Sequence, residues 1–299
     1  MNRSPGPSLY APATRADLVA LGTHRHSGLG SVIYCTEDAI REDELGAALR
    51  QLACALPALN GQPGPQRFIR VRNLEVMREV LTLDLRGVQG LVLPKVHGGN
   101  LGEYMALLKN RPELSVMPTL ETREALSEHH MRRLRDQILR CGWQAQIASL
   151  RIGGNDLLSA LGVRRAPGRT LYEGPLERVI SMLVGVFKPH GFLLSSPVYE
   201  VFEDLVTLAR EVQQDLEYGL SGKTLIHPVQ LDTVLQGYRV SESDLAEAQA
   251  ILAPGAPAVF KMNGRMCEPA THTRWAQDIL ARAEAYGLLP PQTQEALHF

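Results

Sequence analysis

The chain alternates between short, almost continuously apolar runs and longer segments with helical spacing. The short runs are rich in Val, Ile and Leu, as expected for parallel strands that are covered on both faces. Strands that alternate with helical segments indicate βαβ units. Eight runs are predicted as strands: Ser8–Pro12, Ser31–Asp38, Arg67–Arg72, Gly90–Val96, Leu114–Thr122, Ser149–Asp156, Gly191–Tyr199 and Gly222–Pro228.

The segments between these runs carry apolar residues at helical intervals. Glu42–Leu56 repeats leucine in this way, which predicts an amphipathic helix, and Pro57 is predicted to end it. Leu101–Leu108 and Glu200–Tyr218 show the same spacing. Eight strands with helices between them predict an α/β fold of the (β/α)₈, or TIM, barrel type. An open, doubly wound sheet is the alternative.

The sequence continues well past the eighth run, farther than a minimal barrel requires. Ser241 precedes an acidic first turn and is predicted to cap a helix. Asn263-Gly264, within Val259–Cys267, is typical of a hairpin turn, and Thr271–Tyr286 is predicted as a final helix. We therefore expect this helical and hairpin extension to fold over the barrel mouth as a lid or to reach a neighbouring subunit.

The composition is that of an ordinary globular protein, with 299 residues, 44% hydrophobic and 21% charged. The length would allow two average domains, but an α/β barrel of this size forms one. We predict a catalytic barrel domain at residues 1–240 and a lid at residues 241–299. The formal net charge of −1 argues against nucleic acids and membrane surfaces as partners.

Cysteine usage and hydropathy bear on the cellular location. Four cysteines without a C-x-x-C pair argue against a zinc site and against a disulfide framework. The first residues lack the apolar run of a signal peptide. The most apolar stretch, Val179–Leu194, is interrupted by Lys188-Pro189-His190 and is too short to span a bilayer. A soluble, cytoplasmic protein is expected.

Polar side chains gather where the predicted strands end. In a TIM barrel the active site lies at the carboxyl ends of the strands, so these residues should share one rim. Such an accumulation on successive strands favours a functional site over scattered surface polarity. The residues concerned are Glu37, Asp38, Arg70, Lys95, Glu121, Gly154, Asn155 and Asp156.

Two features bear on which ligand the rim holds. Glu121 and Asp156 follow adjacent predicted strands, and two carboxylates without thiolates suit Mg²⁺, which leaves its other positions to water and substrate. The alternative is that this pair only contacts Arg70 or caps the helices that follow.

Gly219–Thr224 has two residues between its glycines where a nucleotide-binding P-loop has four, so a P-loop is rejected.

At these segments the sequence resembles the citrate lyase beta-subunit family, within the aldolase/citrate lyase superfamily. The resemblance covers most of the chain, and the matching segments occur in the family's order. The pattern is closest to a divergent branch of lyase-like barrels from tellurium-resistance-type biosynthetic gene clusters. The segments are Ser8–Pro12, Val32–Ala39, Ile69–Asn73, Val92–Val96, Met117–Thr122, Gly153–Asp156, Gly222–Gln230 and Asn263–Met266.

The resemblance implies carbon–carbon bond lyase or aldolase chemistry on a 2-oxo or 3-hydroxy carboxylic acid, or on an acyl-thioester such as one of coenzyme A. It implies that Glu121 and Asp156 hold Mg²⁺, with Mn²⁺ as an alternative, and that the metal polarises a substrate carbonyl. Arg70 would bind a carboxylate or offset the charge of an enolate. A homo-oligomer, trimeric or hexameric, is also implied.

The remaining rim residues have auxiliary roles under this resemblance. Glu37 and Asp38 would orient Arg70 or metal-bound water. Lys95 would bind the acyl or phosphate end of the substrate, and its alternative is an ion pair with a rim acid. Further residues expected to contact the substrate are Gly154, Asn155 and Pro197.

Several positions depart from the family's pattern. Cys35 replaces an Asp, Arg72 displaces an Asn, and Ser195–Pro197 replaces an Asp-Gly-Pro element. In the lid, Glu268 stands where an Asp is common. Glu268 could still act as an acid or base, but its extra methylene shifts the carboxyl group by about an ångström, which can cost a large rate factor. The metal pair is kept while substrate-facing positions change, so we expect a substrate other than a citryl-thioester.

Three functions are compatible with this pattern. The leading one is a Mg²⁺-dependent lyase or aldolase. The second is a thioesterase that acts on a malyl-type acyl-CoA with Glu268 as its base. The third is a binding subunit that keeps the barrel without catalysis. A small carboxylic acid or acyl-CoA is the expected partner in each case.

Overall fold

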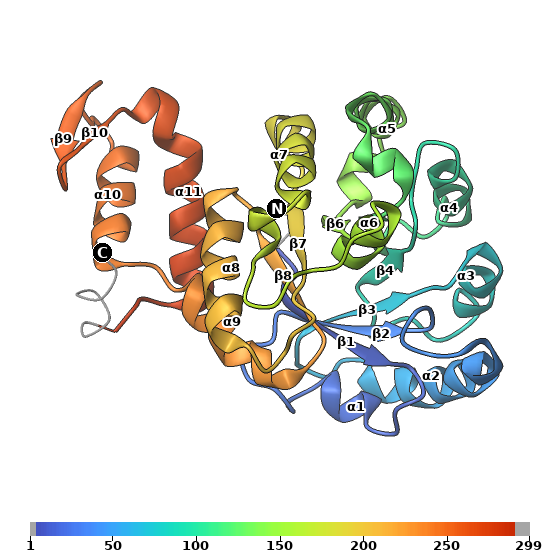
Figure 1. Ribbon diagram of the computed structural model, residues 1–299. Coiled ribbons are helices and arrows are strands. Elements are labelled where there is room, and N and C mark those ends of the chain that lie inside the picture. Colours follow the sequence, from blue (N-terminus) through green and yellow to red (C-terminus); the bar gives the residue numbers. More distant parts are fainter. Residues whose placement is uncertain (1–3, 291–299) are drawn as a thin grey trace. The chain divides into compact units, whose positions relative to one another are not determined.

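A computed structural model describes residues 4–290, which divide into two compact units, one up to residue 231 and the other from residue 232 onward. The first unit is a closed barrel of eight parallel strands in sequential order, with helices around the outside of the sheet (Figure 1). Strand β1 pairs with β8 and closes the barrel. The predicted (β/α)₈ fold is confirmed. Its strands are β1 (Gly6–Pro12), β2 (Ser31–Cys35), β3 (Gln66–Arg70), β4 (Gly90–Leu93), β5 (Ser115–Leu120), β6 (Leu150–Ile152), β7 (Leu194–Val198) and β8 (Gly222–Leu225).

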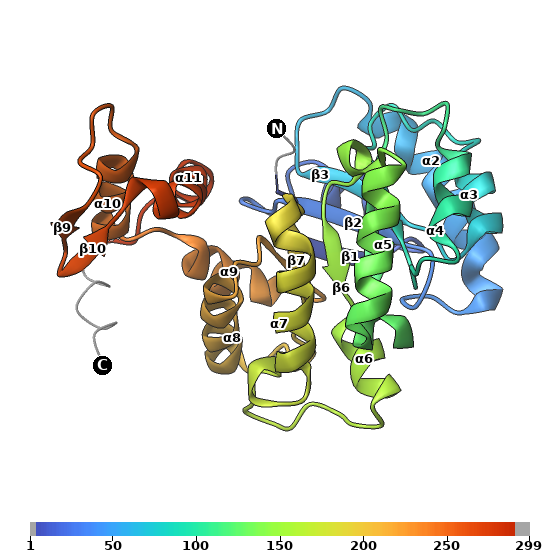
Figure 2. The same ribbon diagram turned by 90° about the horizontal axis from the view of Figure 1, so that it is seen from above.

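The apolar strands fill both sides of the barrel wall. One set of side chains packs inside the lumen, where Ile33, Phe68, Val92 and Met117 form a buried cluster. The alternate set is buried outward, as expected where helices cover a parallel sheet. The helices of this unit, which Figure 2 shows from above, are α1 (Leu18–Leu21), α2 (Leu45–Leu59), α3 (Leu74–Val80), α4 (Leu101–Leu107), α5 (Glu128–Arg140), α6 (Gly154–Ala160), α7 (Leu176–Phe187) and α8 (Leu205–Glu217).

The strands are shorter at their carboxyl ends than predicted. The run Ser31–Asp38 is a strand only to Cys35, and Ser149–Asp156 only from Leu150 to Ile152. Asp156 lies in the first turn of α6. The prediction was wrong there because extended, polar residues at the rim continue the strand pattern after the last ladder hydrogen bond. The rim residues therefore stand on loops and helix starts just beyond the strands.

Two predicted helix boundaries were also wrong. Helix α2 continues through Pro57 to Leu59. A proline in the last turn removes one backbone hydrogen bond, while Leu59 is fully buried, so packing outweighs the loss. The segment Glu200–Tyr218 is helical only from Leu205, because the Asp204 carboxylate accepts the backbone N–H of Thr207 at 3.0 Å and caps the helix there.

The second unit contains helices and one hairpin, so a helical and hairpin extension is present as predicted. Ser241 caps α10 by accepting the amide of Asp244 at 3.0 Å. Asn263 and Gly264 have φ values of +50° and +75° at the hairpin turn, which is the left-handed backbone of a type I′ turn. Its elements are α9 (Leu231–Tyr238), α10 (Glu242–Leu252), β9 (Phe260–Met262), β10 (Arg265–Cys267) and α11 (Pro269–Tyr286).

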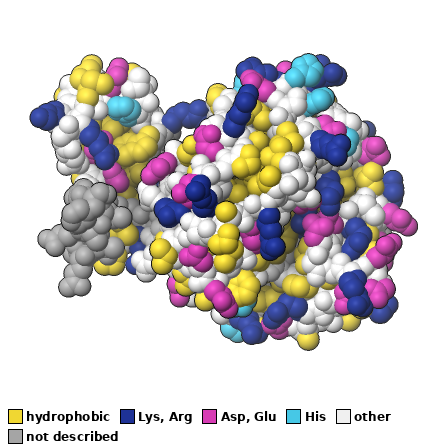
Figure 3. Space-filling view, viewed as in Figure 1, with side chains coloured by type: hydrophobic (Ala, Val, Ile, Leu, Met, Phe, Trp, Pro, Cys, Tyr) yellow, Lys and Arg dark blue, Asp and Glu magenta, His cyan; other side chains and the backbone are white. Residues whose placement is uncertain are grey.

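On the face shown in Figure 3, Lys and Arg side chains are interspersed with Asp and Glu side chains. Among the described helices, none combines the length and apolar character needed to cross a membrane.

Candidate active site at the barrel rim

Arg70 is the centre of a charged cluster at the carboxyl ends of the strands. It is the last residue of β3, and its side chain is 9% exposed. Its Nη2 lies 2.7 Å from Glu37 Oε2, 3.0 Å from Glu121 Oε1 and 3.3 Å from Asp38 Oδ2. Three carboxylates from two loops thus share one guanidinium. The structure brings together the arginine and the rim acids that the sequence predicted for one site.

The loop that carries Glu37 and Asp38 is held by a residue whose role the sequence did not reveal. Arg72 Nε donates to the carbonyl of Thr36 at 3.1 Å, and its Nη2 donates to the carbonyls of Glu37 and Ile40 at 3.2 and 2.8 Å. The Arg72 departure from the family's pattern therefore serves as a clamp on the loop after β2. Its only signal in the sequence was a second arginine at the end of the same strand.

Lys95 reaches the same cluster from the loop after β4. Its φ of +50° lies in the left-handed region, which is unfavourable for a residue with a Cβ. In this conformation its amide donates to Glu121 Oε1 at 2.8 Å, while Nζ lies 2.5 Å from Glu37 Oε1. The Lys95 side chain is half exposed. The ion pair that we considered as its alternative role is present.

Glu121 is the most deeply buried acid of the rim, with a side chain 2% exposed. Burial raises its pKa to about 7, although the Arg70 charge and the Lys95 amide act in the opposite direction. The charges of Asp156 and Glu37 raise it further. Both hydrogen bonds that this carboxylate accepts from the described residues use Oε1. Oε2 lies against Gly153, where a Cβ would come within 2.5 Å of it, so this close approach requires glycine.

Asp156 differs from the other rim acids in having no cation. It is half-buried in the first turn of α6. Among the described residues, its carboxylate accepts no hydrogen bond and forms no ion pair, although its charge acts on Glu121. Neither Arg70 nor Lys95 neutralises it. A carboxylate in this position is available to an added ligand.

The donor chemistry of this pair fits a hard divalent cation. Within residues 4–290 no group of three or more His, Cys, Asp or Glu side chains is placed to hold a metal ion. Mg²⁺ is commonly held by one or two protein carboxylates and completes its shell with water and substrate. Three carboxylates contact the cations of Arg70 and Lys95, and the charge of a fourth, Asp156, acts on Glu121, so negative charge is in excess.

Three further residues predicted to contact the substrate lie on α6, the helix that carries Asp156, and on β7. Gly154 opens α6 against Pro197, since a Cβ at Gly154 would lie 2.8 Å from the Pro197 Cβ and 3.3 Å from a Leu171 methyl carbon. Pro197 is buried, and Asn155 on the same turn is exposed. Gly154 and Pro197 are thus in contact, while Asn155 presents its amide to solvent.

Glu268 belongs to the second unit. It precedes α11, where its amide donates to His272 Nδ1 at 3.1 Å and its Oε2 accepts the Thr271 hydroxyl at 3.2 Å. The half-buried Glu268 carboxyl group is thus tied to its own helix start.

Tyr10 and Arg151 lie in the barrel lumen near Arg70, and the sequence did not predict either as a site residue. The guanidinium carbons of Arg70 and Arg151 lie 5.7 and 5.3 Å from the ring centre of Tyr10. Arg151 is 2% exposed on β6. Arg151 could have been identified from the sequence as a charged residue inside an apolar strand run, because charged side chains are rarely buried unless they are paired.

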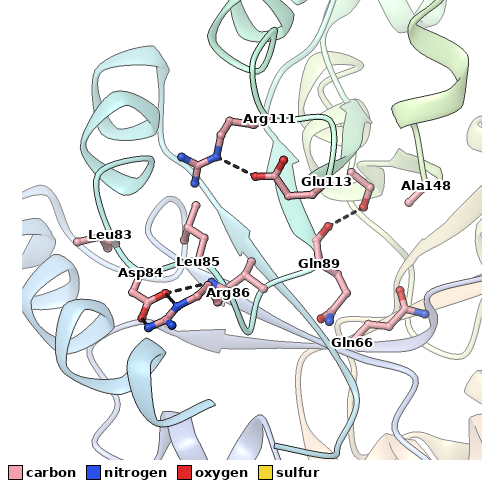
Figure 4. Close-up of a pocket in the computed structure, with 11 residues that line it drawn as sticks. Gln66, Leu83, Asp84, Leu85, Arg86, Gln89, Arg111, Glu113 and Ala148 are labelled. Carbon is pink, nitrogen blue, oxygen red and sulfur yellow. Dashed lines mark hydrogen bonds and ion pairs between the residues drawn. The ribbon is translucent and has the colours of Figure 1, made fainter. Parts of the chain in front are cut away.

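A cavity of about 680 Å³ lies at the opposite end of the barrel, near the amino ends of β3, β4 and β5 (Figure 4). Its charged side chains are paired with one another: Arg86 with Asp84 at 2.7 Å and Arg111 with Glu113 at 2.9 Å. Catalytic residues of TIM barrels come from the carboxyl ends of the strands. The rim cluster is therefore the better candidate for an active site.

Similar proteins support the assignment of the fold and identify the family. The solved structures that resemble the chain include CitE from Mycobacterium tuberculosis in complex with magnesium, acetoacetate and coenzyme A (23% identity, TM-score 0.66, covering 93% of this chain and 98% of that one), and RipC from Yersinia pestis (17%, TM-score 0.63, 80% and 97%). A (3S)-malyl-CoA thioesterase from Cereibacter sphaeroides strain KD131 is 26% identical over 289 residues, covering 93% of this chain and 94% of the relative.

The family match spans nearly the whole sequence. Residues 2–288 match the family described as C-C bond lyase of the TIM-barrel fold. The match agrees with the lyase-like family that the sequence resembles, and the chain shares its fold with CitE and with a citrate lyase beta subunit of Mycobacterium tuberculosis. The chain belongs to the C-C bond lyase family of TIM-barrel enzymes.

Proposed function

We propose that this protein is a Mg²⁺-dependent lyase or aldolase that forms or cleaves a carbon–carbon bond in a 2-oxo or 3-hydroxy carboxylic acid or its thioester. The observation that carries the proposal is the Glu121–Asp156 pair. Within the part of the chain that the structure describes, Asp156 pairs with no cation, and burial and the Asp156 charge raise the pKa of Glu121. A divalent cation would relieve both features. Membership of the C-C bond lyase family supports the reaction class.

The residues around the pair have distinct tasks in this reaction. Glu121 and Asp156 hold the metal, which when bound polarises the substrate carbonyl. Arg70 binds the substrate carboxylate and offsets charge that develops on the enolate oxygen. Its Nε is buried without a hydrogen-bond partner among the described residues, so it has a donor left for this purpose.

Glu37 and Lys95 keep that geometry in place. Glu37 bridges Arg70 Nη2 and Lys95 Nζ through its two carboxylate oxygens. This arrangement fixes the guanidinium plane, which a bidentate contact to a substrate carboxylate requires. Asp38 is half exposed, and its Oδ1 lies 3.7 Å from Lys95 Nζ. Lys95 can exchange this weak contact for one with an anionic end of the substrate.

The metal assignment is tested by calorimetric titration of Mg²⁺ into the Glu121→Gln and Asp156→Asn variants. Loss of partners of metal ligands typically costs about 10- to 100-fold in affinity, so loss of a ligand itself should cost at least as much. Glu113→Gln at the opposite end of the barrel is the control, because Glu113 only pairs with Arg111. Unchanged Mg²⁺ affinity in both rim variants would refute the proposal.

A malyl-type thioesterase is the second candidate, favoured by the 26% identical (3S)-malyl-CoA thioesterase that matches 93% of the chain. It would use the same metal pair and Glu268 as the base. The two reactions give different products from a malyl-CoA substrate. A thioesterase releases free thiol without an aldehyde or oxo acid, whereas a lyase yields the carbonyl product. Glu268→Gln should abolish thiol release if the thioesterase function holds.

A further inference from the structure

Helix α6 carries one of the two proposed metal ligands and depends on its neighbours for its position. It has only seven residues, and its N-cap residue is Gly153, which has no side chain to cap it. Helices this short are not stable on their own in water, so packing has to hold α6 in place. A Cβ at Gly153 would lie 2.4 Å from the Glu121 Cβ, and the next residue, Gly154, lies against Pro197 and Leu171.

Leu171 is held against Gly154 by a buried carboxylate. It is 5% exposed and begins the 3₁₀ turn Leu171–Glu173. Its backbone amide donates to Glu211 Oε2 at 2.8 Å, and hydrogen bonds to a charged acceptor are stronger than neutral ones. An amide anchored in this way fixes the position of the Leu171 backbone. Glu211 therefore also sets where the Leu171 methyl carbon lies, 3.3 Å from the place of a Cβ at Gly154.

Glu211 is fixed in turn by cations from two other segments. It is fully buried on α8, and its Oε1 accepts Lys223 Nζ of β8 at 2.7 Å. Arg165, which lies between α6 and α7, donates to the same carboxylate. Arg165 Nη2 also donates to the Val198 carbonyl at the end of β7 at 3.0 Å. The Glu211 carboxylate thus joins β8, α8 and the segment that follows α6.

We propose that Glu211 and Leu171 are positioning residues of the metal site, which set where α6 begins. Asp156 lies two residues after Gly154 in the first turn of α6, so it moves with Gly154 relative to Glu121. Mg²⁺ requires a near-ideal octahedron with ligand distances of about 2.0–2.1 Å, so a small displacement of one carboxylate weakens its binding. This inference rests on the proposed function in taking Asp156 as a metal ligand.

The test measures Mg²⁺ affinity by calorimetry and the free energy of unfolding by urea in the same variants. Leu171→Ala should weaken Mg²⁺ binding about tenfold, the lower end of what loss of an outer-shell partner costs. Leu171→Met keeps the side-chain volume and should restore most of the affinity. Leu208→Ala is the matched control, because Leu208 is buried on the same helix as Glu211. It should lose stability through the cavity that it leaves without a change in Mg²⁺ affinity.

A second pair of variants isolates the hydrogen bond to the Leu171 amide. Glu211→Gln and Glu211→Met both remove the charge beside Lys223, but only glutamine can still accept the amide. Glu211→Met should therefore weaken Mg²⁺ binding severalfold more than Glu211→Gln. If the Glu211 variants do not fold, the Leu171 variants carry the test. In an Asp156→Asn background, Leu171→Ala should no longer change Mg²⁺ affinity, because the ligand that it positions is gone.

Hydrogen exchange in EDTA examines the same contact without metal. Leu171→Ala should speed exchange of the amides of Gly154–Ala160 severalfold more than Leu208→Ala does. Unchanged Mg²⁺ affinity in Leu171→Ala, or an equal loss in Leu208→Ala, overturns the proposal. Failure of the metal function is distinguishable, because Asp156→Asn then binds Mg²⁺ like the wild type. Hydrogen exchange decides in that case, and equal exchange of α6 in the two leucine variants overturns the positioning role.

Discussion

The barrel contains two buried charge clusters that are built differently. Outside the wall, Lys223 of β8 is fully buried, with Nζ 2.7 Å from Glu211 Oε1 and 2.9 Å from Asp215 Oδ2. Arg165 joins this network through Glu211 and through Glu200 at 2.8 Å. Every charged side chain here contacts an opposite charge. At the rim, by contrast, Asp156 and one N–H of Arg70 lack partners among the described residues.

The difference separates a cluster that holds the fold from one that is completed by a ligand. The Lys223 network ties β8 to α8 and, through the Leu171 amide on Glu211 at 2.8 Å, to the segment that packs on Gly154. It has no charge left for a ligand. The rim cluster keeps excess carboxylate and unused donors within a barrel end where chemistry usually occurs.

The largest effect is expected for Lys223→Met. It leaves Glu211 and Asp215 buried without their shared cation, and removal of one partner of a buried ion pair typically costs about 3–5 kcal/mol. Urea unfolding measures this loss. Lys95→Met is the comparison at the rim, where the lysine is half exposed and the expected cost is about 1 kcal/mol or less. Equal costs for the two lysines would remove the distinction between the clusters.

Asp156→Asn should have little effect on the stability of the fold and a large effect on Mg²⁺ affinity. Because Asp156 forms no ion pair among the described residues, the free energy of unfolding without metal should change by about 1 kcal/mol or less. Mg²⁺ affinity should fall at least about tenfold, since a ligand is lost. Unfolding with EDTA and calorimetry with Mg²⁺ measure the two quantities. A large loss of stability in EDTA would instead make Asp156 a structural residue.

Sequence periodicity predicted the barrel and which polar residues lie at its rim, because both follow from the local pattern of apolar and polar residues. Apolar runs mark the strands, and parallel strands deliver Glu37, Arg70 and Glu121 to one end. The strand ends were extended too far, since polar rim residues still alternate like a strand. Local pattern also placed Ser241 and the Asn263-Gly264 turn correctly.

The long-range side-chain partners could not be predicted. Lys223 lies in a glycine-rich segment that resembled a nucleotide loop, and only the fold shows its contacts with Glu211 and Asp215. Arg151 and Arg67 are both arginines in apolar strands. Whether carbonyls or hydroxyls surround each one depends on strand register and loop packing, which single-sequence periodicity does not specify.

The pH dependence of Mg²⁺ binding should report on the rim cluster and not on the Lys223 network. Below pH 7 the affinity should rise by about tenfold per pH unit, because one ligand must lose a proton. Metal ligands must be deprotonated, and the pKa of Glu121 is raised to about 7, so affinity should rise with pH up to about 7 and then level off. Asp215 has a pKa raised by burial to about 6 but should have no influence on the profile. Titration of Asp215→Asn should therefore match the wild type, and a profile that is flat between pH 5.5 and 8 in the wild type would contradict the role of Glu121.

Without metal, the same raised pKa affects stability with the opposite sign. A carboxyl group whose pKa is higher in the folded state stabilises the fold when it is protonated, and this contribution is lost as pH rises through about 7. Glu121→Gln should remove that part of the pH dependence in EDTA. Stability that varies with pH in the same way for wild type and Glu121→Gln would show that Glu121 does not titrate in this range.

The smallest effect concerns the backbone of Lys95. Its φ of +50° is unfavourable for a side chain with a Cβ, so Lys95→Gly should be more stable than Lys95→Ala by about 1 kcal/mol. Both variants lose the contact of Nζ with Glu37 and keep the amide that donates to Glu121. Equal Mg²⁺ affinity in Lys95→Gly and Lys95→Ala would show that the backbone amide of residue 95 positions Glu121. If Lys95→Ala is the more stable variant, the left-handed turn is absent in solution, and the rim acids are then held by side chains alone.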